Sequence, residues 1–77
     1  MRIYYTKHAK ERMTLRKITE AMLKASLIDP DEIAYGYFGR SIVFKKFIQG
    51  VIKVVFIKEK NKQIIISVIW HSRNKKL

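Results

Sequence analysis

The sequence contains no cysteine. A disulfide framework, a thiolate metal site and a thiol nucleophile are therefore excluded. Small secreted domains often depend on disulfides, so this absence favours the cytoplasm. The N-terminus lacks a basic segment followed by a continuous apolar run, so we expect no signal peptide. The longest apolar runs are only about the length of Val54–Ile57, far too short to span a membrane.

Glycine and acidic residues are also scarce. The glycines at positions 36, 39 and 50 form neither a phosphate loop nor a dinucleotide-binding fingerprint. The two histidines are far apart and carboxylates gather mainly at Asp29–Glu32, so we expect no metal site and no cofactor. No serine lies in a nucleophile elbow, and the carboxylate pair of glycosidases is missing. These absences exclude most enzyme classes.

Positive charge dominates what is present. The 77 residues include 17 Lys and Arg against 6 Asp and Glu, which gives a net charge of +11. Such a field predicts an acidic partner, either nucleic acid, an acidic protein or an anionic membrane. Solubility or thermal adaptation is the alternative explanation of the lysines. Apolar residues make up 48% of the chain, which argues against disorder and predicts a single domain over residues 1–77 with a small core.

Residues 6–28 predict two helices. Thr6 and Thr19 can each cap a helix through the side-chain hydroxyl, and Ile18 can act as the apolar residue of a staple. Pro30 should end the second helix, because proline disfavours helix in the residue before it. We therefore expect a two-helix hairpin with one apolar face. The predicted buried positions are Ala9, Met13, Ala21, Met22, Ala25 and Ile28.

The rest of the chain predicts strands joined by short connections, which is typical of an antiparallel meander. The predicted strands are Ile33–Phe38, Ser41–Ile48, Val51–Lys58 and Gln63–Arg73, and residues 3–5 could add a short strand at the start. The predicted fold class is therefore α+β, with the helix hairpin packed on a twisted antiparallel sheet of about four strands.

Alternation along the last two strands predicts two faces of the sheet. The predicted core face carries Ile52, Val54, Phe56, Ile64, Ile66, Val68 and Trp70. The opposite face carries Val51, Lys53, Val55, Ile57, Ile65, Ser67, Ile69, His71 and Arg73. A face that mixes apolar residues and cations is a candidate binding surface. An ordinary exposed sheet face is the alternative.

One metal-independent reaction matches the available side chains. Cleavage of RNA by its own 2′-hydroxyl needs groups that move protons and cations that hold the phosphate. His71 is the candidate acid or base, because imidazole titrates near neutrality, and Lys53 and Arg73 are the candidate cations. The alternatives are a structural or merely exposed His71, and a basic solvated tail in which Lys75 and Lys76 follow Arg73.

A stripe of basic residues marks the first predicted helix. His8, Arg12 and Arg16 are four residues apart and therefore stand on one side of the helix. Like charges at this spacing repel one another, so the stripe either faces an anionic partner or serves the fold. In the second case the arginine stems would cover apolar surface, or the guanidinium groups would pair with carboxylates. Arg40 and Lys45 are further candidates for nucleic-acid contact.

The segment His8-Ala9-x-x-Arg12-Met13-x-x-Arg16-x-Ile18-Thr19, followed by Asp29-Pro30, resembles the signature of a family of short prokaryotic proteins. That family is similar to the BrnT toxins and lies near the RelE/ParE superfamily of toxin–antitoxin systems. The resemblance implies a helix hairpin on a twisted antiparallel sheet, and a metal-independent endoribonuclease that acts on mRNA, commonly on the ribosome. It also implies an acidic antitoxin as partner, with no membrane involved.

Carried over to this sequence, the resemblance places His71 near the terminal acid or base position. Lys45, Lys53 and Arg73 become candidates for phosphate contacts. The alternative function is a non-catalytic basic module that binds nucleic acid, or an inactive toxin relative. Its support is the charge together with aromatic residues that could stack on unpaired bases, namely Tyr35, Tyr37, Phe38 and Trp70.

Overall fold

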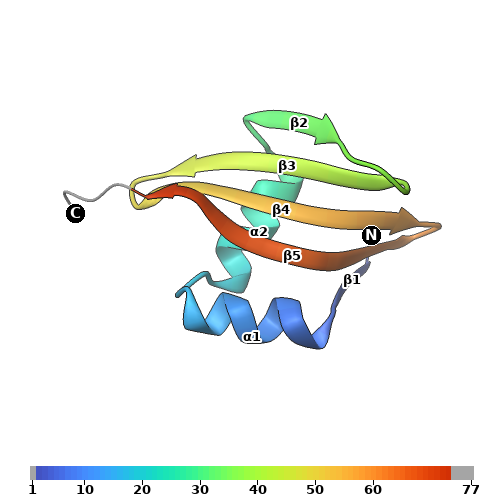
Figure 1. Cartoon of the computed structure of the whole chain (residues 1–77), viewed down its shortest axis with the longest axis horizontal. Coiled ribbons are helices and arrows are strands. Elements are labelled where there is room, and N and C mark those ends of the chain that lie inside the picture. Colours follow the sequence, from blue (N-terminus) through green and yellow to red (C-terminus); the bar gives the residue numbers. More distant parts are fainter. Residues whose placement is uncertain (1, 74–77) are drawn as a thin grey trace.

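The computed structural model describes residues 2–73, so Lys75 and Lys76 lie outside the described residues. The elements in chain order are β1 (Arg2–Tyr5), α1 (Lys7–Leu15), α2 (Glu20–Ile28), β2 (Glu32–Tyr35), β3 (Arg40–Phe47), β4 (Gly50–Glu59) and β5 (Lys62–Arg73) (Figure 1). The predicted α+β class is confirmed. The sheet has five strands rather than about four.

The predicted helix boundaries are confirmed by their caps. The Thr6 hydroxyl accepts a hydrogen bond from the Ala9 backbone N–H at 3.2 Å, and α1 begins at Lys7. The Thr19 hydroxyl accepts from the Met22 N–H at 3.1 Å, and α2 begins at Glu20. α2 ends at Ile28, two residues before the proline. Each side-chain acceptor satisfies a backbone donor that has no partner within its helix.

The strand order in the sheet is β1-β5-β4-β3-β2. β2 to β5 form the predicted antiparallel meander, but β1 pairs in parallel with β5, from Arg2 opposite Lys62 to Tyr5 opposite Ile65. The prediction of an entirely antiparallel sheet is therefore wrong at this edge. Parallel strands require a long crossover connection, and here nearly the whole chain lies between the two partners. No local pattern could reveal that pairing.

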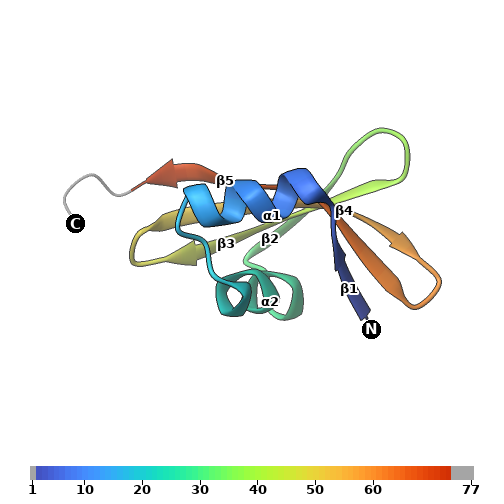
Figure 2. The same cartoon turned by 90° about the horizontal axis from the view of Figure 1, so that it is seen from below.

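The two helices pack on different parts of the sheet. α1 contacts chiefly β5, whereas α2 contacts β3 and β4 (Figure 1). Figure 2 shows α2 on one side of the sheet and α1 running along β5. The two helices of the predicted hairpin are therefore spread apart, and within residues 2–73 the opposite side of the sheet carries no helix.

The core lies between the sheet and the helices. The buried apolar residues are Ala9, Met13, Ile18, Leu23, Val43, Ile52, Val54, Phe56, Ile65 and Val68. The predicted apolar face of α1 and the core face of β4 are confirmed. The predicted face of α2 is confirmed at Met22, which packs against the core, but it is wrong at Ile28, which is 83% exposed, while Leu23 and Ser26 are buried. Ser26 tolerates burial because its hydroxyl donates to the Met22 carbonyl at 2.9 Å.

Two bulges interrupt the alternation of β5. Ile65 lies opposite Phe56 and Ser67 opposite Val55, which leaves Ile66 as an extra residue. In the same way His71 is the extra residue between Trp70 and Ser72. A bulge shifts every later side chain relative to simple alternation. Ile65 is therefore buried instead of the predicted Ile64 and Ile66, and the predicted core face holds only at Val68 and Trp70.

The turn between β2 and β3 begins earlier than predicted. β2 ends at Tyr35, whereas the predicted strand ran to Phe38. Phe38 and Gly39 have φ angles of 59° and 71°, in the left-handed region, and the Gly36 N–H donates to the Arg40 carbonyl at 2.9 Å. Two successive left-handed residues form the tight turn that matches strand twist in a hairpin.

Among the described side chains, Tyr5 has a buried polar atom that lacks a hydrogen-bond partner. Its hydroxyl is inaccessible to solvent and makes no hydrogen bond within residues 2–73. Burial raises the pKa of Tyr5 above its ordinary value of 10.0, and the negative charge of Glu20 raises the pKa further. Burying a hydroxyl without a partner costs about 1–3 kcal/mol.

We expect Tyr5→Phe to increase the free energy of unfolding by about 1 kcal/mol at neutral pH, because it removes a desolvated hydroxyl and keeps the ring. In the wild type, stability should fall as pH rises above 10, because the unfolded state then loses the tyrosine proton more readily than the folded state. Urea titrations at neutral and alkaline pH measure both effects. Tyr35→Phe, at an 81% exposed site, is the control. A loss of stability in Tyr5→Phe would show that the hydroxyl has a stabilising partner.

Candidate nucleic-acid interface

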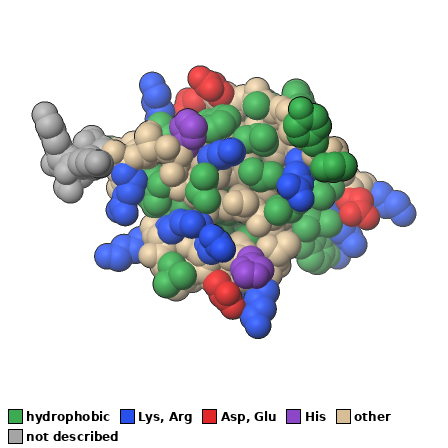
Figure 3. Space-filling model, in the orientation of Figure 1, with side chains coloured by type: hydrophobic (Ala, Val, Ile, Leu, Met, Phe, Trp, Pro, Cys, Tyr) green, Lys and Arg blue, Asp and Glu red, His purple; other side chains and the backbone are tan. Residues whose placement is uncertain are grey.

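The side of the sheet that carries no helix, here called the open face, is a mixed apolar and cationic surface. Two rows of side chains cross it, Glu32–Phe44–Lys53–Ile69 and Ala34–Ile42–Val55–Ser67. Their strand neighbours, such as Val43 and Val54, are buried on the helix side, so these rows point the other way. Figure 3 shows hydrophobic side chains interspersed with Lys and Arg on this face.

Lys53 lies in the middle of the open face. It is half-buried on β4, opposite Phe44 on one side and Ile69 on the other. The predicted alternation of Val51, Lys53, Val55 and Ile57 on this face is confirmed, and all four are half-buried. Apolar neighbours lower the effective dielectric constant around an ammonium group, which strengthens its attraction for an anion.

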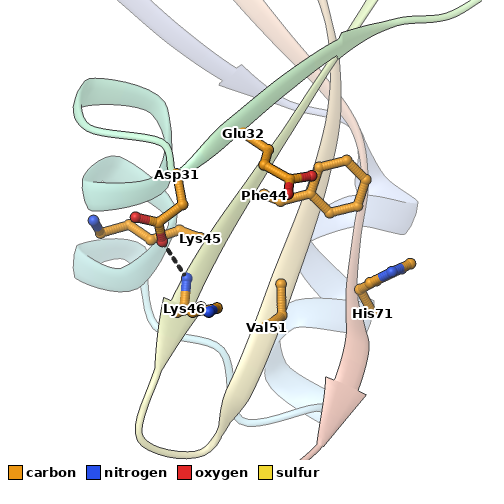
Figure 4. Close-up of a pocket in the computed structure, with 7 residues that line it drawn as sticks. All are labelled: Asp31, Glu32, Phe44, Lys45, Lys46, Val51 and His71. Atoms are coloured by element: carbon orange, nitrogen blue, oxygen red, sulfur yellow. Dashed lines mark hydrogen bonds between the residues drawn. The ribbon is translucent and has the colours of Figure 1, made fainter.

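His71 lies at one border of the same face. Its ring packs edge-on against Phe44, with 5.0 Å between the ring centroids, and the residue is exposed. Figure 4 shows both side chains around a shallow depression of about 190 Å³. Residues that line it are Asp31, Glu32, Phe44, Lys45, Lys46, Val51 and His71. The Asp31 carboxylate accepts a hydrogen bond from the Lys46 backbone N–H at 2.7 Å, so part of the acidic border serves the fold.

Arg73 lies on the other side of the sheet from His71. Its guanidinium group stands over the Trp70 ring, 5.4 Å from the centroid, and Trp70 packs against the core on the helix side. The prediction that His71 and Arg73 share a face is therefore wrong. The reason is the bulge, in which His71 is an extra residue, so that Arg73 falls on the opposite face from the one that simple alternation along β5 predicts. Of the three predicted catalytic residues, the structure brings together Lys53 and His71 around Phe44.

Two of the predicted nucleic-acid contacts instead have protein partners. Arg16 Nη1 donates to the Val68 carbonyl at 3.0 Å, and the Arg16 carbonyl accepts from Trp70 Nε1 at 2.9 Å. Lys45 Nζ donates to the Asp29 carbonyl at 2.7 Å and lies 3.5 Å from the Asp29 carboxylate. A cation at the C-terminal end of α2 also stabilises the helix dipole.

The remaining candidates are free at the surface. His8, Arg12 and Arg40 are exposed, and within the described residues none of these side chains makes a hydrogen bond or ion pair. The stripe on α1 therefore divides in two. Arg16 holds the fold together, whereas His8 and Arg12 remain available to a ligand.

Phe44 is the site residue that the sequence reasoning missed. Lys53 is its cross-strand partner on β4, and its ring reaches His71 on β5. Its place in the predicted strand Ser41–Ile48 was a usable signal, because alternation puts it on the face opposite the buried Val43. The contact with His71 could not be predicted, because the bulge brings the imidazole there.

Residues 5–70 match the family described as domain of unknown function DUF4258, and the chain belongs to this family. No curated protein and no solved structure matches the chain. Over residues 2–73, neither helix is long and apolar enough to cross a membrane. The same residues include no group of three His, Asp or Glu side chains placed to hold a metal ion.

The different positions of Arg16 and Arg12 predict different roles in stability. Arg16→Met should lower the free energy of unfolding by about 1–3 kcal/mol, because it leaves the Val68 carbonyl without its charged donor. Arg12→Met removes the same charge from an exposed site and should change stability by less than about 0.5 kcal/mol. Urea denaturation followed by circular dichroism measures both. Equal losses would show that Arg16 has no special structural role.

Proposed function

We propose that the protein binds RNA on its open face and cleaves it without a metal ion, as a toxin of the BrnT/RelE type that acts on mRNA. The observation that carries the proposal is the grouping of His71, Phe44 and Lys53. An exposed imidazole packs on an aromatic ring, and a half-buried ammonium group lies one strand away on the same face. The net charge of +11 supports a polyanionic substrate.

The reaction is transesterification by the RNA itself. The 2′-oxygen attacks the adjacent phosphorus, the bond to the 5′-oxygen breaks, and the products are a 2′,3′-cyclic phosphate and a 5′-hydroxyl. His71 performs one of the two proton transfers, either from the 2′-hydroxyl or to the leaving oxygen, and solvent performs the other. Lys53 stabilises the negative charge that develops on the phosphate oxygens. Arg73 has no part in this proposal, because it lies on the other side of the sheet.

One observation favours a second candidate function, a module that binds nucleic acid without cleaving it. Within residues 2–73, the His71 imidazole has a packing contact with Phe44 but no hydrogen bond to a group that would fix its orientation. Catalytic bases are normally oriented by such a third group. The open face and its cations would serve binding equally well.

The proposal includes an acidic antitoxin as protein partner and the cytoplasm as the place of action. A strongly basic domain attracts an acidic protein through its field, and complementary charge accelerates association. Apolar side chains exposed beside the C-terminal end of α2 offer such a partner contact area. They are Ile28, Ile33 and Tyr35, and Lys58 lines the same groove.

Cleavage of a translated mRNA tests the proposed function. The purified protein is incubated with the mRNA in EDTA, with and without ribosomes, and the ends are mapped by primer extension. We expect discrete cuts that survive EDTA, and a loss of at least about a hundred-fold in rate for His71→Asn, because proton transfer contributes that much or more. His8→Asn is the matched control, since it removes the other exposed imidazole.

Each other result has a defined meaning. Intact RNA with folded wild-type protein, together with salt-sensitive RNA binding, would replace the nuclease by the binding module. If His8→Asn loses activity while His71→Asn keeps it, proton transfer belongs to α1 and the assignment of His71 is wrong.

A further inference from the structure

The turn between β2 and β3 exposes two aromatic side chains at the end of the sheet far from His71. Tyr37 is 86% exposed and Phe38 is 91% exposed, and their ring centroids are 6.5 Å apart with the planes tilted by 55°. Neither ring contributes to the core. We call these two residues the aromatic tip.

Within the aromatic tip, the backbone conformation at Phe38 is unfavourable for a bulky side chain. Phe38 has a φ of 59°, which glycine adopts freely but which a bulky side chain adopts only at a cost. The neighbouring Gly39, at 71°, shows that the turn does accept glycine. The fold would therefore gain stability without the Phe38 ring. A strained and exposed ring is evidence of a role other than folding.

Cations lie at the same end of the sheet as the aromatic tip, although the β2–β3 and β4–β5 turns bend to different sides of it (Figure 2). Arg40 lies two residues after Phe38 and pairs with Ile57, which brings Lys58 and the β4–β5 turn to the same end of the sheet (Figure 1). That turn carries Lys60 and Lys62, and Arg2 pairs with Lys62 across the β1–β5 edge. A shallow depression on the turn is lined by Arg2, Lys60, Asn61 and Lys62. In this part of the described chain, Glu59 is the one carboxylate among these cations.

From this arrangement we infer that the aromatic tip is a binding site for unpaired RNA bases. The rings stack on bases, and Arg40 holds an adjacent phosphate, while the lysines of the β4–β5 turn add to the positive field at this end of the sheet. The inference rests on RNA being the ligand of the proposed function, and it adds that the RNA is single-stranded at this end. RNA is favoured over an acidic protein because exposed rings beside cations match the alternation of bases and phosphates.

The aromatic tip also lies in line with the site at His71. Arg40 and Phe44 both belong to β3, four residues apart, which corresponds to roughly 14 Å along the strand. RNA held at the tip and lying along β3 would therefore pass over the open face toward Phe44 and His71. Stacking at the tip would set which phosphate reaches His71.

Phe38 variants separate a binding role from a structural one. Phe38→Gly removes both the ring and the strain, whereas Phe38→Tyr keeps both. We expect Phe38→Gly to raise the melting temperature and to weaken binding of a fluorescein-labelled single-stranded RNA by about 5- to 100-fold in anisotropy titrations. Phe38→Tyr should match the wild type in both measurements. Leu15→Ala, at an 81% exposed site on α1, is the control for loss of an exposed apolar side chain.

The same RNA annealed to its complement completes the experiment. Affinity for the duplex should be equal in wild type and Phe38→Gly, because paired bases cannot stack on the tip. If Phe38→Gly binds the single strand as tightly as the wild type, the aromatic tip is not an RNA site, and the proposed function remains. If folded wild-type protein binds neither RNA, the proposed function fails and the inference fails with it.

Discussion

Two hydrogen bonds through Arg16 join the first helix to the last strand. The guanidinium group donates to the Val68 carbonyl, and the Arg16 carbonyl accepts from the Trp70 indole. β1 pairs only with residues 62–65 of β5, so the rest of that strand would otherwise present a free edge. α1 covers this edge and places Ala9 and Met13 in the core. This attachment closes the part of the β5 edge that β1 leaves unpaired and holds α1 against the core.

Local physics made much of the fold predictable. Thr6 and Thr19 start helices because their hydroxyls satisfy backbone donors three residues later, and β4 alternates because one of its faces is buried. The features that could not be predicted depend on distant partners. The parallel pairing of β1 joins residues about sixty positions apart, and the bulges at Ile66 and His71 depend on how β5 fits β4. Because simple alternation was extended through both bulges, Ile64 and Arg73 were placed on the wrong faces.

The same limit applied to the candidate site. Residue type and charge drew attention to His71 and Lys53, and the structure places both on the open face. Type alone could not distinguish a free cation from one that is already bound. Arg16 and Lys45 were predicted to contact nucleic acid, but each donates to a backbone carbonyl. Arg16 donates to Val68 on β5, and Lys45 donates to Asp29 at the end of α2. Only the tertiary structure separates these two groups of basic residues.

The strand that organises the sheet is also the last strand within the described residues. β5 lies between β1 and β4, and α1 packs against it, so neither the first strand nor the first helix has its main partner until residues 62–73 have been synthesised. Contacts between such distant segments slow folding, because a long loop must close before they form. Until residues 62–73 have been synthesised, β1 and α1 would therefore remain without the strand on which they pack. For a protein proposed to attack mRNA, activity would then require β5 to have been synthesised and paired.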